Sequence, residues 1–228
     1  IFSVEDFTLV LDWVDPQEKE IEEFWSLAFT PDSKKLFVSG KRKSRRHWDT
    51  TDGDNKIKPC HIKLIDLERD HVQVLEFHLE EVFCLLPCEF DGGWYLLSGS
   101  YDGHVAKWAF TSKWRCLNPT KPVVFKDGGS CSVYDLALVP GTGSKYFLGA
   151  CDQRIKIFDM DEERVIQLLD IHYDSNADFV SFFQPWQDIS SSVESGEASS
   201  PCLWFVTRGV PALNPDGTLA GKCVCQVH

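Results

Sequence analysis

The chain has 228 residues, of which 43% are hydrophobic and 13% aromatic, so it contains enough apolar material for a substantial core. Its formal net charge of -12 repels the phosphate backbone of nucleic acids and favours basic partners, so no direct nucleic-acid binding is expected. Nine irregularly spaced Cys residues do not resemble a disulfide framework, and no run approaches the roughly 20 apolar residues of a membrane span.

Short segments typical of β-strands follow one another along the chain, separated by Gly, Pro, Asp and Ser. Residues 4–13 are expected to form an outer strand, and "PQEKEIEE" (16–23) is the one place where a short helix could form. The sequence therefore predicts an all-β fold, with strands at 24–29, 35–40, 61–67, 72–77, 82–87, 94–100, 104–110, 133–139, 145–150 and 154–160, and weaker strand-like runs at 179–183, 203–206 and 222–227.

An insertion over residues 41–59 separates two of these strands. Its first part, "KRKSRR" (41–46), carries five positive charges in an otherwise acidic chain. We expect this connection to lie at the same end of the fold as the turn at 101–102. It is either a solvated loop tip or a contact for nuclear import or an acidic partner, and its candidate contact residues are Arg45, His47 and Trp48.

Two segments of the chain repeat one another. "SYDGHVAKWAF" (100–110) matches "CDQRIKIFDM" (151–160) at an offset of 50 residues, which aligns Asp102 with Asp152 and Trp108 with Phe158. The segments "WSLAF", "FCLLP" and "YDLAL" repeat at intervals of 58 and 51 residues. A unit of four short strands that recurs about every 40 to 45 residues, apart from insertions, is typical of a β-propeller blade.

The second of these units resembles the WD-repeat family. That resemblance implies a buried hydrogen-bond network with a structural role, formed by His78, Ser98, Asp102 and Trp108. The chain also departs from the family pattern. Phe77 stands in place of the usual Gly, Ala109 stands in place of the usual Asp, and the third unit has no matching His.

The sequence predicts a WD-repeat β-propeller of four-stranded antiparallel blades. Propellers have about four to eight blades, and WD-repeat propellers usually have about seven, whereas this chain accounts for about four. We therefore expect residues 1–228 to form a single, partial propeller with insertions at 41–59 and 187–201. The second insertion is Ser-rich, acidic and free of aromatic residues, so it is expected to be disordered.

Aromatic residues stand at the starts of successive innermost strands, where a propeller narrows to its channel mouth. If their rings reach the surface they can clamp a peptide side chain, and an aromatic cage around methylated lysine is one such arrangement. The alternative is packing between blades. "EEFWSLAFTPDS" (22–33) is also faintly similar to Polycomb-type propeller subunits, which have an aromatic residue at this place. The residues concerned are Phe24, Trp25, Phe83 and Tyr134, with Tyr101 on the same face.

The sequence contains no nucleophile elbow, phosphate loop or metalloprotease helix, so no enzymatic activity is expected. His47 lies near Asp49 and Asp54, but in an insertion that is unsuited to holding catalytic groups in place. Cysteines near the C-terminus lack paired C-x2-C spacing, so we expect neither a metal nor a cofactor.

We therefore predict a non-catalytic scaffold subunit that mediates protein–protein interactions in a multiprotein complex. Its partners are expected to be basic peptides or helices of other subunits, with no membrane contact. The protein is expected inside the cell, in the nucleus or cytoplasm, with the nucleus favoured. Two alternatives stay open: a chromatin-associated reader of a basic or methyl-lysine histone tail, and a substrate receptor of a ubiquitin ligase.

Overall fold

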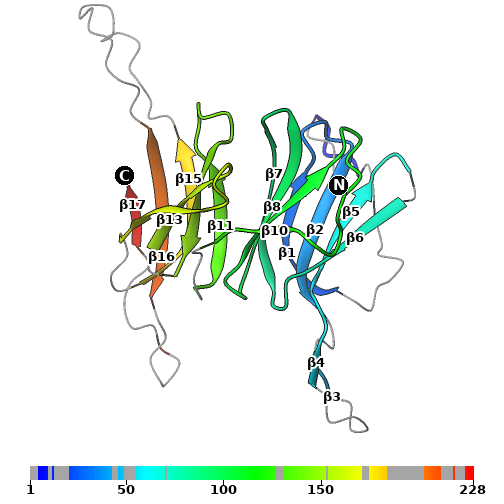
Figure 1. Ribbon diagram of the computed structural model, residues 1–228, viewed down its shortest axis with the longest axis horizontal. Helices are drawn as coiled ribbons and strands as arrows, with labels where there is room; N and C mark the ends of the chain where they lie inside the picture. The colour runs from blue at the N-terminus through cyan, green and yellow to red at the C-terminus, as the bar shows by residue number, and fades with distance from the viewer. Residues whose placement is uncertain are drawn as a thin grey trace, which may run out of the picture.

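The computed structural model describes residues 5–9, 12, 21–42, 46–48, 55–69, 71–126, 131–152, 154–170, 175–183, 203–211, 218 and 224–228, to which every structural statement below refers (Figure 1). The ordered elements in these residues are β-strands. None of the described residues belongs to a helix long and apolar enough to cross a bilayer.

The strands form four radial sheets, here called blades 1 to 4, in which every pairing is antiparallel. Blade 1 consists of β1 (Ile21–Phe29), β2 (Lys35–Arg42), β5 (His61–Asp66) and β6 (His71–Glu76). Blade 2 consists of β7 (Val82–Phe90), β8 (Gly93–Ser100), β9 (Val105–Phe110) and β10 (Val123–Val124). Blade 3 consists of β11 (Val133–Leu138), β12 (Tyr146–Cys151), β13 (Arg154–Asp159) and β14 (Arg164–Leu169). In blade 4 the described strands are β15 (Ser175–Phe183), β16 (Trp204–Pro211) and β17 (Val224–Val227).

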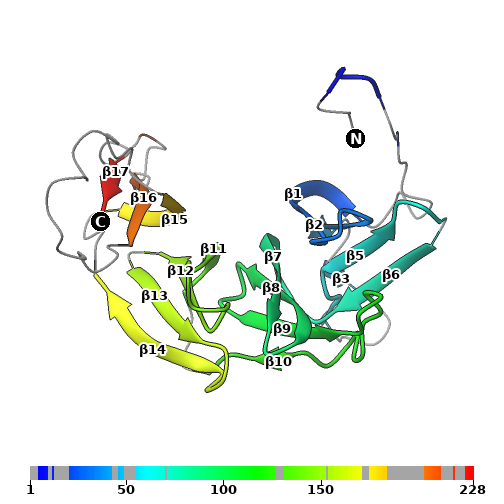
Figure 2. The same cartoon turned by 90° about the horizontal axis from the view of Figure 1, so that it is seen from above.

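Seen from above, the blades fan along an arc, and β1, β7, β11 and β15 lie on its inner side (Figure 2). This arrangement is a partial β-propeller, which confirms the predicted fold class. It also brings the starts of four strands, widely separated in sequence, next to one another.

Some local predictions were wrong. Residues 21–23, the end of the one segment where a short helix could form, belong to β1, in which Ile21 is buried and pairs with Arg42. Of the strand predicted at 4–13, residues 5–8 are not in a strand and Leu9 forms a bridge, whereas residues 4, 10, 11 and 13 lie outside the described residues. The outer strands β10 and β14 were not predicted. Residues 41–59 include the two-stranded hairpin of β3 (Arg46–Trp48) and β4 (Asn55–Ile57).

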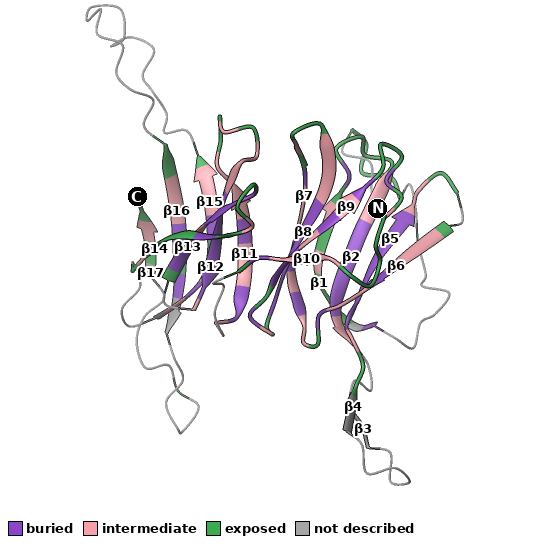
Figure 3. Ribbon diagram, viewed as in Figure 1, coloured by how far each residue is buried: buried purple, intermediate pink, exposed green. Residues whose placement is uncertain are grey.

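Each inner blade buries both of its faces. Along β8, Leu96 packs into the cluster shared with blade 1, whereas its neighbour Leu97 packs into the cluster shared with blade 3. Phe147 and Leu148 divide in the same way between blades 2 and 4. Successive strand residues point to opposite faces, so a strand covered on both sides reads as a continuous apolar run. Figure 3 shows the buried residues concentrated in the strands rather than in the turns.

The outer faces of the two end blades carry exposed apolar side chains. Ala28 packs toward blade 2, so Leu27 and Phe29 point the other way and are exposed. In blade 4, the directly paired Phe183 and Trp204 are exposed in the same manner. These are the faces on which a propeller of more blades would continue.

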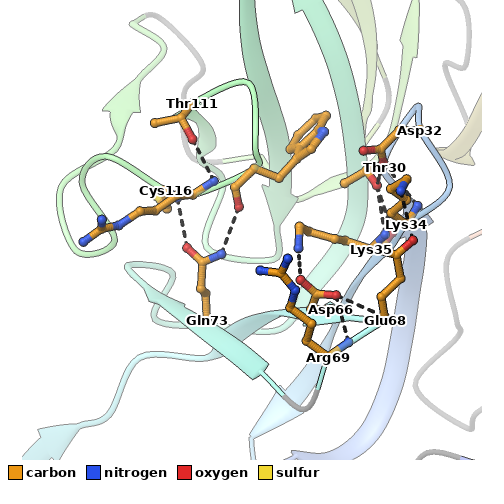
Figure 4. Close-up of polar contacts among 12 residues, drawn as sticks. Thr30, Asp32, Lys34, Lys35, Asp66, Glu68, Arg69, Gln73, Thr111 and Cys116 are labelled. Carbon is orange, nitrogen blue, oxygen red and sulfur yellow. Dashed lines mark hydrogen bonds and ion pairs between the residues drawn. The ribbon is translucent and has the colours of Figure 1, made fainter.

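The turn between the third and fourth strands of a blade is where Ala109 departs from the Asp of the WD-repeat pattern. In blade 1 the Asp66 carboxylate accepts the amide N–H groups of Glu68 and Arg69 and pairs with Lys35, as Figure 4 shows. Asp159 closes the same turn in blade 3 through two amides. Ala109 occupies this position in blade 2 and has no side-chain acceptor, and the connection that follows is long.

The connection between β9 and β10, residues 111–122, holds blade 2 against blade 1 through Trp114. The indole is 1% exposed and its ring centroid lies 5.8 Å from that of Phe37 in blade 1. The Gln73 side-chain amide donates to the Trp114 carbonyl oxygen at 2.9 Å and accepts the Cys116 amide N–H at 3.0 Å (Figure 4). Gln73 thereby ties to blade 1 a segment that folds back on β9 through the Phe110–Cys116 bridge.

We expect Trp114→Ala to lower the free energy of unfolding by about 3–5 kcal/mol, because it removes a large buried ring and leaves a cavity between two blades. Urea unfolding followed by circular dichroism measures the loss. Lys113→Ala changes an exposed neighbour and should alter the free energy of unfolding by less than about 0.5 kcal/mol. Equal stability of the two variants would show that Trp114 does not fasten the blades.

Candidate functional site

The same irregularity occurs near the start of every innermost strand. Each strand contains a β-bulge, in which one extra residue lies between two residues that pair with neighbours on the second strand. The extra residues are Trp25 in β1, Phe83 in β7, Tyr134 in β11 and Asp178 in β15. Because the bulges are equivalent in position, these side chains lie on the same face of the propeller, where the innermost strands begin.

Three of the four bulge residues are aromatic, and their rings touch. The Phe83 ring centroid lies 5.3 Å from that of Trp25, edge to face, and 5.3 Å from that of Tyr134, stacked at 29°. Tyr101, in the turn after β8, contacts Phe83 at 6.1 Å. We call Trp25, Phe83, Tyr101 and Tyr134 the aromatic row. Trp25 and Tyr101 are each 51% exposed, so the row is open to a ligand.

Other residues proposed as contacts from the sequence lie apart from the row. Phe24 is exposed but makes no ring contact with the other described aromatic residues. It precedes the bulge, at the position held by Val82 in blade 2. Arg45 lies outside the described residues. For His47 and Trp48 only the backbone, in β3, is described. Their roles as contacts stay predictions.

The fourth bulge residue, Asp178, had not been identified from the sequence. Arg208 in β16 donates to it through Nε at 2.9 Å and through Nη2 at 2.7 Å, a two-point contact that neutralises the carboxylate. The aromatic row therefore ends in a paired acid. Nothing in "NADFVSFF" marks this residue, since the bulge depends on which residues of β16 lie opposite.

A hollow of about 400 Å³ lies at the junction of blades 3 and 4, at the same end as the row. It is lined by Cys131, Cys151, Asp152, Arg154 and Asn176. Burial raises the pKa of the Cys151 thiol to about 12, so this side chain is neutral at physiological pH. The pKa of Tyr134 is raised mainly by burial, and the carboxylates of Asp152 and Asp178 add to the rise.

The four residues of the expected network are hydrogen-bonded to one another in blade 2. The His78 Nδ1 lies 3.0 Å from a carboxylate oxygen of Asp102, and its Nε2 lies 2.8 Å from Ser98 Oγ. The Trp108 indole N–H donates to the same Ser98 oxygen at 2.9 Å. Phe77, which replaces the usual Gly, packs edge-on against both His78 and Trp108. The network thus joins the turn to two strands inside the blade.

The electrostatics of this network favour an ionised Asp102. Burial disfavours the charged carboxylate, but the hydrogen bond and charge of His78 and the amides of His104 and Leu79 outweigh it. They lower the pKa of Asp102 to about 2. The carboxylate is thus engaged from several sides within the blade, which fits a structural role.

Among the described residues no three His, Cys, Asp or Glu side chains converge in a way that could hold a metal ion. The described cysteines near the row are free thiols: Cys84 and Cys151 are buried within the blades, and Cys131 is half-buried.

Comparison with known proteins bears on these features. A family model described as "WD domain, G-beta repeat" matches residues 69–108, the segment that contains the whole network of blade 2. A solved β-propeller domain of Cps50 (Swd1) from Myceliophteria thermophila covers 85% of this chain at 9% identity with a TM-score of 0.51. Residues 69–108 are thus similar to a WD repeat, and the chain as a whole has the fold of a β-propeller. Among curated proteins, none matches it in sequence.

Two further solved structures share the β-propeller fold of this chain. A chain of the mitotic checkpoint complex covers 88% of it at 15% identity with a TM-score of 0.52. Dihydro-heme d1 dehydrogenase NirN, solved in complex with DHE, covers 89% at 11% identity with a TM-score of 0.51. The chain spans 49%, 52% and 38% of the lengths of these three structures, in the order given. At such identities the likeness concerns the fold alone.

The low pKa of Asp102 predicts a pH-dependent stability. Its folded-state pKa of about 2 lies below the ordinary value of 3.8, so it contributes stability above about pH 4, and this is lost as the pH falls toward 2. Relative to Asp102→Asn, the wild-type protein should lose up to about 2 kcal/mol between pH 5 and pH 2. Urea unfolding at each pH measures it, and parallel pH profiles of the two proteins would contradict the assignment.

Proposed function

We propose that this WD-repeat protein is a non-catalytic scaffold subunit that binds a peptide segment of a partner along the aromatic row. The observation that carries the proposal is the placement of Trp25, Phe83 and Tyr134 at equivalent bulges of three successive blades, with their rings in contact. Aromatic side chains supply much of the binding energy at protein interfaces, because each buries a large area with few rotatable bonds.

The row is well suited to recognition because it is rigid. Three of its four rings, those of Trp25, Phe83 and Tyr134, are carried by inner strands that pair with their neighbours on both sides of the bulge. The blades are also packed against one another. A ligand therefore meets a surface that is already in its bound shape and loses little affinity to ordering it.

The charge of the protein indicates the kind of segment that it binds. A net charge of -12 attracts basic partners and speeds their encounter. A lysine or arginine side chain also interacts favourably with the faces of aromatic rings. We therefore propose that the bound segment is basic.

A second candidate is a chromatin-associated reader of a methyl-lysine histone tail, which would act in the nucleus. The exposed Trp25 ring contacts Phe83, and Phe83 contacts the exposed Tyr101 ring. These exposed aromatic rings favour this candidate, because methylated ammonium groups bind between aromatic faces. The role of substrate receptor of a ubiquitin ligase has no comparable support and stays a prediction from the sequence.

Our proposal assigns no chemistry to the row itself. Its members are aromatic residues without a nucleophile hydrogen-bonded to a base, an arrangement that covalent catalysis requires. The fold alone does not decide this point, since NirN is a dehydrogenase on a similar scaffold.

Selection of 12-residue peptides from a random library on the full protein tests the proposal. We expect Phe83→Ala to weaken the selected peptides by about 30-fold, because Phe83 contacts the other three members of the row. Leu117→Ala removes an exposed apolar side chain from the blade 2 connection and serves as the matched control, with no change expected. Undiminished binding by Phe83→Ala, or recovery of no peptide, would refute the binding role.

Calorimetry with histone-tail peptides distinguishes the reader from a general scaffold. A reader should bind a trimethyllysine peptide about 10-fold more tightly than its unmodified form, and Trp25→Ala should abolish that difference. Phe24→Ala should leave it intact, because Phe24 lies outside the row. Absent or methylation-independent binding removes the reader candidate.

A further inference from the structure

The turn between the second and third strands carries an Asp in blades 2 and 3, but the two carboxylates have different surroundings. In blade 2, Asp102 is occupied by His78 and by the amides of Leu79 and His104. Blade 3 has no His that matches His78. Within the described part of the chain, no hydrogen bond or ion pair reaches the side chain of Asp152.

Two other described acids nearby are already paired. Asp170 forms an ion pair with Arg154 at 2.8 Å, and Asp178 is held by Arg208. Arg154, the cation that lines the hollow, is therefore partly neutralised. Among the described lining residues Asp152 is the one acid, and no ion pair with another described residue compensates its charge.

The hollow adjoins the aromatic row. The Ala177 amide donates to the Asp152 carbonyl oxygen, which joins the blade 3 turn to β15 one residue before the Asp178 bulge. The charge of Asp152 also acts on the Tyr134 hydroxyl, the last aromatic group of the row. A peptide lying along the row therefore passes the mouth of the hollow as it reaches blade 4.

We propose that this hollow is the subsite for one lysine or arginine side chain of the bound peptide, with its cation on the Asp152 carboxylate. The inference rests on the proposed function and adds a specific position to it. Asn176 offers an amide oxygen as a second acceptor, and Cys131 and Cys151 line the hollow without adding charge. A volume of about 400 Å³ accommodates a long side chain.

The test uses the peptides selected on the wild-type protein and the variant Asp152→Asn. Asp152 has a φ of 49°, a left-handed conformation that Asn also adopts readily, so the turn is retained. We expect Asp152→Asn to weaken binding about 10-fold, because a charge-assisted hydrogen bond is lost. Replacing the responsible peptide residue, arginine by citrulline or lysine by norleucine, should cost a similar factor, and the two changes together should cost little more than either alone.

Asp161→Asn is the matched control. It removes the same charge from blade 3 at an exposed site that pairs with Lys145, and binding should change less than 2-fold. If Phe83→Ala abolishes binding while Asp152→Asn leaves it unchanged, the subsite is refuted and the aromatic row stands. Selection of peptides that contain neither lysine nor arginine refutes the subsite and the basic character of the bound segment, and leaves the aromatic row standing. Unchanged binding by Phe83→Ala, or recovery of no peptide, overturns the row and the subsite together.

Discussion

Face-to-face packing between sheets is the interaction on which the whole structure depends. Each inner blade is apolar on both faces, as Leu96 and Leu97 show, so no blade is complete without a neighbour on each side. The same packing sets the angle between blades and brings the four innermost strands together. The aromatic row is therefore a product of the core, since no two of its bulge residues belong to the same blade.

Blades 2 and 3 use one turn for two purposes. In blade 2 the turn Asp is satisfied by His78 and stabilises the blade from within. Blade 3 has no such hydrogen-bond network among its described residues. Phe158, which aligns with Trp108, has no N–H group to donate and instead stacks on Phe147 at a centroid distance of 4.7 Å. Without the histidine the turn Asp has no internal partner. Because blade 3 lacks the His–Asp hydrogen bond, the Asp152 carboxylate stays available to a ligand.

Much of the fold follows from local sequence patterns. Runs such as "WYLLSGS" and "RIKIFDM" predict strands because β-branched and aromatic residues alternate between two buried faces, and the 50-residue offset predicts the blades. The network of His78, Ser98, Asp102 and Trp108 was foreseen through the family resemblance. Outer strands such as β10, with two residues, carry too short a pattern to be recognised.

The candidate site was only partly predictable, because its decisive features are relations between distant segments. The sequence places Trp25, Phe83 and Tyr134 at the starts of strands, but a bulge exists only relative to the partner strand. Asp178 and Asp152 were missed for this reason: pairing with β16 defines the first, and contact with β15 places the second beside Tyr134.

In the repeated bulge, the residue proposed to contact a ligand is not one of the residues whose pairing stabilises the blade. A bulge residue faces no partner across the sheet, so its side chain contributes little to the pairing that holds the blade together. Trp, Phe, Tyr and Asp occupy four equivalent places, and in each case strand pairing continues on both sides of the bulge. Binding preference in such a protein can therefore diverge one blade at a time, through single substitutions that the fold tolerates.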